Sequence, residues 1–233
     1  MVQELACQYS SKVGNAEFEK WWAVQGGWVE EPNQRRGGVS GVQLLHRSEE
    51  RCLPVYIKKQ TGHIYRSLRY PLGRPTILRE KEVYETFSTI GVRTPRMIFS
   101  EARKYDGEWQ ALLITESLDG YVNLEQWFSD LHDKELNDLL IKELAITLAR
   151  MHESGWQHGC CYPKHIFVKA SSDVLDNVRI DVALLDLEKS RRRWTVKKAA
   201  EKDLNQLIRH RGNIPLAALL ILQRLHDEYL MLN

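Results

Sequence analysis

The chain has 233 residues, of which 43% are hydrophobic and 27% charged, a balance that excludes a disordered, collagen-like or coiled-coil protein. Its 33 Lys and Arg residues oppose 31 Asp and Glu residues, giving a formal net charge of +2, so we expect no nucleic-acid partner. No segment approaches about eighteen uninterrupted apolar residues, and the polar start of the sequence has no apolar signal core, so we expect neither a transmembrane helix nor export.

Residues 1–115 read mainly as short strands with one or two helices, and we interpret them as an N-terminal lobe. Runs of β-branched residues indicate strands, and a helical pattern that starts at a polar residue and stops at glycine indicates a helix. The predicted elements are an amphipathic stretch over Asn15–Val24, a strand over Leu53–Lys58, a helix over Ile77–Ile90 between the N-cap Thr76 and Gly91, and a hairpin of Met97–Arg103 and Trp109–Thr115 around Tyr105–Gly107.

Residues 116–233 read as mostly helical after a linker near Glu116–Gly120, and we interpret them as a C-terminal lobe. Leucines recur at helical spacing from Leu136 to Leu148, which predicts a long amphipathic helix over Lys134–Glu153. The other predicted elements are strands over Ile166–Lys169 and Val178–Asp186, and helices over Val196–Arg211 and Pro215–Met231. A strand-rich lobe followed by a helical lobe predicts a bilobal fold of the α+β class.

The four cysteines do not form a disulfide framework in this interpretation. They are Cys7, Cys52, Cys160 and Cys161, of which two are neighbours and none belongs to a C-x-x-C pair. The expected location is therefore the reducing cytoplasm.

Three features of the first half suggest a phosphate site. The segment Gly37–Gly41 is rich in glycine, which lets backbone N–H groups approach a phosphate. Lys58 ends the strand segment VYIK and could reach a phosphate as a compact charge. Either Glu80 or Glu82 on the following helix could hold Lys58 in place, but these two lie on different helix faces, so only one can point inward.

Two features of the second half suggest further chemistry. The loop His158–Val168, with the sequence HGCCYPKHIFV, follows the long helix and enters a strand. Asp186, in the segment LLDLE, ends an apolar strand, and a carboxylate there suits Mg²⁺, which prefers oxygen ligands.

The order of strand lysine, helix glutamate, histidine loop and strand-end aspartate resembles the protein-kinase signature set. The strand that carries the lysine corresponds to VYIK, the catalytic loop to HGCCYPKH and the metal-binding segment to DLE. Asp203 matches an acid that braces the catalytic loop from a later helix. Within that superfamily, HGCCYPKHIFVK, LLDLEKSRRRW and KDLNQL look like the bacterial lipopolysaccharide kinase family, and more like its InaA-type branch than its core heptose kinases.

The resemblance implies a protein-kinase-like fold, with a small antiparallel sheet in the N-terminal lobe and helices in the C-terminal lobe, that uses ATP and Mg²⁺. It assigns Lys58 to the α- and β-phosphates and Glu80 to positioning it, with Asp186 and His165 at the metal. His158 and Asp203 brace the loop, and Cys160 occupies the place of the catalytic base. The remaining assignments are phosphate cover by Gly37, Gly38 and Gly41, adenine contacts from the backbone of Glu116 and Leu118, and gating of the pocket by Thr115 or Ile114.

The resemblance also implies an acceptor. Sixteen residues separate Asp186 from Asp203, and this interval has no A-P-E motif, so we expect no docked protein substrate. The family implies transfer of phosphate to a sugar hydroxyl of the lipopolysaccharide core or a related glycolipid, with peripheral contact at the inner face of the membrane. Basic residues that could hold such an anionic acceptor are Arg66, Arg69, Arg74, Arg79, Arg191, Arg192, Arg193, Lys197 and Lys198.

Two departures from the kinase pattern leave alternatives open. Cys160 replaces the aspartate base, although a thiol is a poor base, and His165 replaces an asparagine, although imidazole is a poor Mg²⁺ ligand. The chain could therefore be a pseudokinase that binds nucleotide or a partner without turnover. Two further alternatives are a zinc site of His158, Cys160, Cys161 and His165, and a nucleophilic Cys160 or Cys161 activated by His158.

Overall fold

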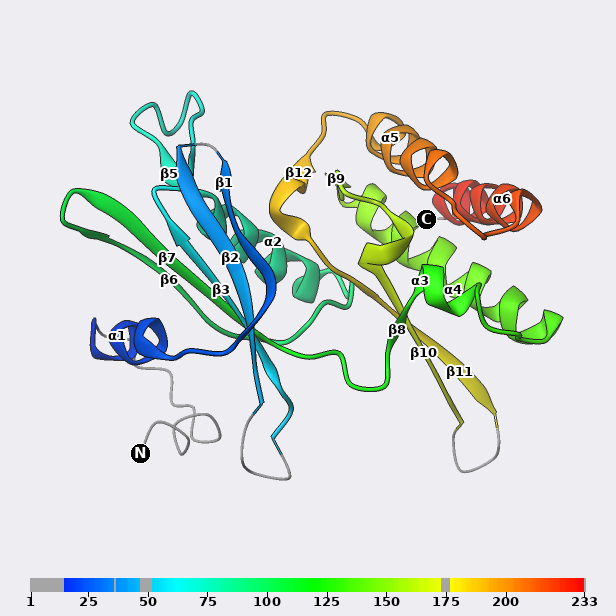
Figure 1. Cartoon of the computed structure of the whole chain (residues 1–233). Helices are drawn as coiled ribbons and strands as arrows, with labels where there is room; N and C mark the ends of the chain where they lie inside the picture. Colours follow the sequence, from blue (N-terminus) through cyan, green and yellow to red (C-terminus); the bar gives the residue numbers. More distant parts are fainter. Residues whose placement is uncertain (1–14, 36, 47–51, 173–176, 233) are drawn as a thin grey trace. The chain divides into compact units, whose positions relative to one another are not determined.

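The computed structural model describes residues 15–35, 37–46, 52–172 and 177–232 (Figure 1). The chain divides into two compact units. Unit 1 comprises Met1–Glu82 and Pro95–Asp119, and unit 2 comprises Val83–Thr94 and Gly120–Asn233.

Unit 1 is built on a five-stranded sheet in the order β1-β2-β3-β7-β6, in which all neighbours pair antiparallel. The strands are β1 (Gly27–Arg35), β2 (Gly38–Leu45), β3 (Val55–Thr61), β6 (Met97–Tyr105) and β7 (Glu108–Glu116). The turn between β6 and β7 has positive φ at both Asp106 (50°) and Gly107 (80°), as a type I′ turn requires. The hairpin predicted around Tyr105–Gly107 is therefore confirmed.

Strand β3 presents its two sides to different helices because successive side chains alternate across a strand. Val55 and Ile57 are fully buried in the core that the helix α1 (Asn15–Ala23) completes. That core also contains Phe18, Trp21, Val24, Ile98, Phe99, Leu112 and Ile114. Lys58 and Gln60 belong to the other alternating set and bond residues at the start of the helix α2 (Thr76–Thr89).

The start of α2 differs from the prediction. Thr76, expected as the N-cap, is the first helical residue and is fully buried. Its hydroxyl donates to Gln60 at 2.9 Å and lies 2.8 Å from Nδ1 of His63, so the side chain is taken by buried partners that the sequence does not reveal. The short strands β4 (Ile64–Tyr65) and β5 (Arg74–Pro75) pair with each other just before α2.

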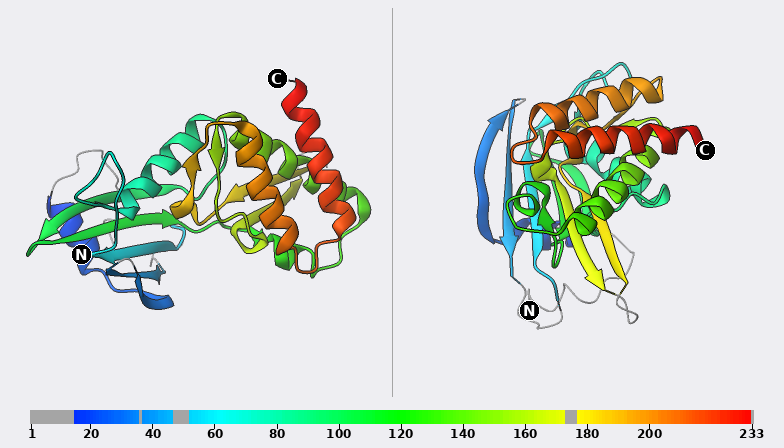
Figure 2. Two further views of the ribbon diagram at one scale, coloured as in Figure 1. Left: turned by 90° about the horizontal axis from the view of Figure 1, so that it is seen from above. Right: turned by 90° about the vertical axis from the view of Figure 1, so that its right-hand side faces the viewer.

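Helix α4 (Lys134–Glu153) has the predicted bounds and is the central helix of unit 2. The side chain of Asp133 accepts a hydrogen bond from the amide of Leu136 at 2.7 Å and caps the first turn, while Gly155 follows the last turn with φ +78°. Figure 2 shows α4 with α5 (Val196–Arg209) and α6 (Leu216–Leu232), both of which pack against it. Leu144 and Leu148 are fully buried in this packing.

Unit 2 also contains more β-structure than its helical pattern predicts. A three-stranded sheet has the order β11-β10-β8, and β9 pairs with β12. The elements are β8 (Val122–Asn123), α3 (Leu124–Trp127), β9 (Trp156–Gln157), η2 (Pro163–His165), β10 (Ile166–Ser172), β11 (Val178–Leu184), η3 (Leu187–Lys189) and β12 (Arg191–Arg192). Strand β11 stops before the predicted end at Asp186, because Asp186 has left-handed backbone angles (φ 58°, ψ 60°) that cannot continue a strand.

The cysteines differ in part from the expectation. Cys52 is disulfide-bonded, which contradicts the prediction that a disulfide framework does not fit the chain. Cys160 and Cys161 are free and buried, and Cys7 lies outside the described residues. Within the described ranges, none of the helices has the length and apolar character needed to cross a membrane.

Candidate active site

Unit 1 contains a nearly buried ion pair between the middle of its sheet and α2. Nζ of Lys58 lies 2.7 Å from a carboxylate oxygen of Glu80, and their side chains are 16% and 4% exposed. Glu82, the other candidate partner, is half exposed and lies 2.8 Å from Arg74. The register of α2 therefore turns Glu80, and not Glu82, toward Lys58.

Gly37, Gly38 and Gly41, the glycines predicted to cover the phosphates, are each required by the local structure for a different reason. Gly37 has φ +73°, which a turn residue with a side chain rarely adopts. At Gly38 a Cβ atom would lie 2.3 Å from the carbonyl oxygen of Thr61, so the backbone that approaches this glycine is the chain's own. Gly41 lies inside β2, where a Cβ would lie 2.6 Å from the ring of Trp28. Gly37 thus serves the turn, and Gly38 and Gly41 serve the packing of the sheet, whatever ligand this backbone contacts.

Two backbone amides at the end of β7 already donate to partners within unit 1. The amide of Glu116 donates to the carbonyl of Arg96 at 2.9 Å, and the amide of Ser117 donates to the carbonyl of Pro54 at 2.8 Å. The carboxylate of Glu116 accepts a hydrogen bond from Nε of Arg96 at 2.7 Å. The Glu116 amide is therefore already bonded, so an adenine ring at this position would need other backbone groups of the segment Glu116–Leu118.

In unit 2, Asp203 of α5 holds the loop that begins at His158. One carboxylate oxygen accepts from the His158 amide at 2.6 Å, and the other accepts from the Gly159 amide at 2.9 Å. Nε2 of His152 lies 3.2 Å from the first oxygen. Burial raises the pKa of Asp203, but its hydrogen bond with His152 and the nearby histidines lower it more, so the pKa lies below its ordinary value.

Four more residues support this loop, and none was a predicted site residue. Gln206 and Ser190 bond backbone groups of the loop, whereas His152 and His226 support it through Asp203. Gln206 accepts from the amide of Cys161 at 2.8 Å, and the Ser190 hydroxyl donates to the carbonyl of His158 at 2.9 Å. Nδ1 of His152 lies 2.8 Å from Nε2 of His226 on α6, and both rings are fully buried. The position of Gln206, three residues after Asp203 on the same helix face, is the only one for which the sequence held a signal.

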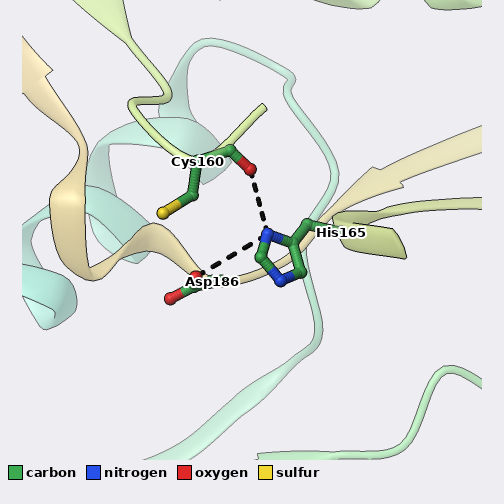
Figure 3. Close-up of side chains that lie close together, drawn as sticks. All are labelled: Cys160, His165 and Asp186. Atoms are coloured by element: carbon green, nitrogen blue, oxygen red, sulfur yellow. Dashed lines mark hydrogen bonds and ion pairs between the residues drawn. The ribbon is translucent and has the colours of Figure 1, made fainter. Parts of the chain in front are cut away.

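Cys160, His165 and Asp186 converge at the other side of the loop (Figure 3). One ligand atom from each, a thiol sulfur, a ring nitrogen and a carboxylate oxygen, lie within 4.8 Å of one another. Nδ1 of His165 lies 2.9 Å from the carbonyl oxygen of Cys160 and 3.6 Å from a carboxylate oxygen of Asp186. The left-handed backbone of Asp186, unfavourable for a residue with a Cβ, helps to fix the direction of this carboxylate.

The environment of the loop argues against a cysteine nucleophile. Burial, together with the charge of Asp186, raises the pKa of Cys160 to about 12, and burial raises that of Cys161 well above its ordinary value. Burial lowers the pKa of His158 to about 4, and its Nδ1 accepts from the Cys160 amide at 3.1 Å rather than from a thiol. Both thiols are therefore protonated near neutral pH, and neither has an activating base.

The zinc alternative with four ligands does not match the geometry. The candidate ligand group contains Cys160 and His165 but takes Asp186 in place of His158 and Cys161. The same group fits Mg²⁺ only in part, because the Asp186 carboxylate is a hard oxygen ligand whereas a thiol and an imidazole are not.

Comparison with known proteins decides the family. The model of the lipopolysaccharide kinase (Kdo/WaaP) family matches residues 19–227. The chain belongs to this family. It is 42% identical over 205 residues to Protein InaA of Escherichia coli (strain K12), a match that covers 86% of this chain and 91% of InaA.

A solved structure shows the fold. The structure described as "WaaP in complex with acyl carrier protein" has a TM-score of 0.67 and 21% sequence identity, covering 91% of this chain and 82% of that one. The predictions of a protein-kinase-like fold of the lipopolysaccharide kinase type, with an antiparallel N-terminal sheet and a helical C-terminal region, are confirmed.

Proposed function

We propose that this protein is an ATP-dependent kinase that transfers phosphate to a sugar hydroxyl of the lipopolysaccharide core or a related glycolipid. The ion pair of Lys58 and Glu80 carries the proposal. A nearly buried pair contributes little to stability, since desolvation of both charges offsets their attraction. A lysine held by a carboxylate at the middle of the sheet is, in contrast, what a phosphate site needs.

The residues of the chain divide the chemistry as follows. Lys58 would contact the α- and β-phosphates of ATP, and Asp186 would ligate the divalent cation, Mg²⁺ in most kinase-like enzymes, that neutralises the phosphate charge. The acceptor hydroxyl attacks the γ-phosphorus, its proton leaves to solvent, and ADP departs. His158 and Asp203 keep the loop in place.

Cys160 does not serve as the base in this scheme, because its thiol is protonated near neutral pH. Phosphoryl transfer passes through a loose transition state, so positioning and charge stabilisation supply most of the rate. The missing base would cost about 10²–10⁴-fold, which slows the reaction without abolishing it.

The glycolipid acceptor is supported by family membership and by the surface of unit 1. Leu68 and Leu72 are fully exposed between β4 and β5, in a segment that also contains Arg66 and Arg69. Exposed leucines among arginines suit an anionic membrane surface, where the side chains enter the lipid and the charges meet the headgroups. Peripheral contact with a membrane would bring the protein to its acceptor.

A transfer assay with γ-labelled ATP and purified lipopolysaccharide core glycolipid tests the reaction. Lys58→Met and Glu80→Gln should each lower incorporation of label at least a hundredfold, and Asp186→Ala should abolish it. Glu82→Gln is the matched control, since this half-exposed carboxylate pairs with Arg74 and should leave the rate within a factor of two. Unchanged transfer in Lys58→Met and Asp186→Ala would reject the site.

A pseudokinase is the second candidate, favoured by Cys160 and His165 in place of the usual aspartate and asparagine. A ligand that binds only the folded chain raises the melting temperature by mass action. ATP with a divalent cation should therefore stabilise the chain in both cases. Stabilisation without incorporation into any glycolipid tested would favour the pseudokinase.

Membrane contact has its own test. We expect the chain to sediment with vesicles that contain phosphatidylglycerol but not with neutral phosphatidylcholine vesicles. Leu68→Ser with Leu72→Ser should reduce sedimentation severalfold, whereas Leu131→Ser, at an equally exposed leucine of unit 2, should not. Equal sedimentation of all variants would refute this role for the segment.

A further inference from the structure

The group formed by Cys160, His165 and Asp186 does not have the composition of a magnesium site. Mg²⁺ prefers oxygen ligands in near-octahedral geometry and is usually held by one or two carboxylates. Here one carboxylate is accompanied by a thiol and an imidazole. Sulfur and nitrogen ligands suit softer ions such as Zn²⁺ and Co²⁺, so the ligand set disagrees with the cation that the fold implies.

The distances in the group suit a small tetrahedral site. Zinc bonds of about 2.0–2.3 Å place neighbouring ligands about 3.3–3.8 Å apart. The Nδ1 atom of His165 and the Asp186 carboxylate oxygen are already 3.6 Å apart, and the three ligand atoms lie within 4.8 Å. The longest separation in the group therefore exceeds the tetrahedral spacing by no more than about an ångström.

The three side chains are buried to different extents, as in a catalytic metal site and not as in a closed structural one. Cys160 is only 1% exposed, and its sulfur lies within 4.8 Å of a ligand atom of each of the other two side chains. The side chain of Asp186 is 37% exposed, so the group opens toward solvent on that side. Three protein ligands with a fourth position open to water or a phosphate oxygen is the arrangement of catalytic zinc sites.

We propose that Cys160, His165 and Asp186 bind a borderline transition-metal dication, with Zn²⁺ as the type ion, in preference to Mg²⁺. The ion displaces the thiol proton of Cys160, which leaves to solvent, and the ring proton of His165 moves from Nδ1 to Nε2, so the ligands are a thiolate, a neutral imidazole and a carboxylate. The inference rests on the proposed function for the role of the ion beside a phosphate, but not for its binding.

The experiment uses Co²⁺ as the probe, added to the untagged full chain after chelator treatment and without nucleotide. Thiolate-to-cobalt charge-transfer absorption reports a bound sulfur, and the d–d bands report tetrahedral geometry. We expect one equivalent of Co²⁺ with the sulfur band. Cys160→Ser should lose this band, whereas Cys161→Ser, the matched control at the neighbouring buried thiol, should keep it. A hundredfold excess of Mg²⁺ should not displace the ion.

Three results would overturn the inference: no sulfur band, the same band in Cys160→Ser, or displacement of Co²⁺ by an equal concentration of Mg²⁺. If circular dichroism shows that Cys160→Ser is misfolded, His165→Asn decides, since it should weaken binding at least about tenfold. Wild-type affinity in that variant would also overturn it.

The same measurements separate this inference from the proposed function. A chain that binds ATP and transfers phosphate but gives no sulfur band refutes the ion site alone. A chain that binds Co²⁺ through Cys160 but never incorporates phosphate refutes the kinase alone. Lys58→Met, which should lose nucleotide binding, should keep the cobalt band because Lys58 is not one of the three proposed ligands.

Discussion

Asp203→Asn is the sharpest test of how the loop at His158 is held. The wild-type carboxylate is fully buried and accepts from two backbone amides, at 2.6 and 2.9 Å, besides its contact with His152. Asparagine keeps the shape, but only one of its two terminal atoms can accept a hydrogen bond. One buried amide therefore loses its acceptor and faces an NH₂ group.

The magnitude follows from these contacts. A buried donor left without a partner costs about 1–3 kcal/mol, and bonds to a charged acceptor are worth about 1.5–3 kcal/mol. We expect the free energy of unfolding to fall by about 2–4 kcal/mol, a large part of the 5–15 kcal/mol that is about the usual total. Asp227→Asn, at a half-exposed carboxylate that bonds His226, should cost less than about 1 kcal/mol.

Urea denaturation followed by far-ultraviolet circular dichroism measures the loss, and hydrogen exchange locates it. In Asp203→Asn the amides of His158 and Gly159 should exchange faster than in the wild type, while amides in the sheet of unit 1 should not change. A loss below about 1 kcal/mol with unchanged exchange at both amides would refute the view that Asp203 holds the loop.

The pH dependence of this difference has a definite sign. The pKa of Asp203 is lower in the folded chain than its ordinary value of 3.8, so the ionised carboxylate stabilises the fold. This contribution is complete above pH 3.8 and is lost as the pH falls through the folded pKa. The stability gap between wild type and Asp203→Asn should therefore be largest near neutral pH and shrink below about pH 4.

Two further predictions concern packing. Gly38→Ala should lower the melting temperature by several degrees, because the added Cβ would lie 2.3 Å from the Thr61 carbonyl oxygen. Gly27→Ala is the control, since a Cβ there would have nothing within 4 Å and should change the melting temperature little. Equal shifts of the two variants in differential scanning calorimetry would contradict this. His226→Phe should lower the free energy of unfolding, measured in urea, by about 1–3 kcal/mol, because Nδ1 of the buried His152 loses its partner. An unchanged free energy of unfolding would show that water replaces this bond.

The sequence predicts best where local signals agree. The bounds of α4 are correct because its leucine spacing predicts a helix that, in the structure, the Asp133 cap begins and Gly155 ends. The β6–β7 hairpin is correct for a similar reason, since Asp106-Gly107 matches the turn type that such a hairpin requires.

The sequence predicts least where a distant partner decides. The residue pattern alone does not decide whether Glu80 or Glu82 pairs with Lys58, because the choice depends on the register of α2 against the sheet. Thr76 looks like an N-cap, but its hydroxyl is taken by Gln60. The pair of His152 and His226 joins residues 74 positions apart, and no local pattern marks either ring as buried.

Cys160→Asp tests the role of the thiol, because an aspartate supplies both a general base and an oxygen ligand for Mg²⁺. An aspartate there can accept the hydroxyl proton and is also a hard ligand beside Asp186. If the wild type lacks a base, phosphate incorporation in Mg²⁺ should rise about 10²-fold or more, and the cobalt sulfur band should disappear.

Cys160→Ser is the control for Cys160→Asp, because it removes the sulfur without supplying a carboxylate and should not raise the rate. A fall in incorporation for the folded Cys160→Asp variant, with Mg²⁺ and with Zn²⁺ alike, would show that the thiol itself contributes to turnover. A rise confined to Mg²⁺ would instead show that residue 160 sets which cation the site uses, since only the ligand type at that position has changed.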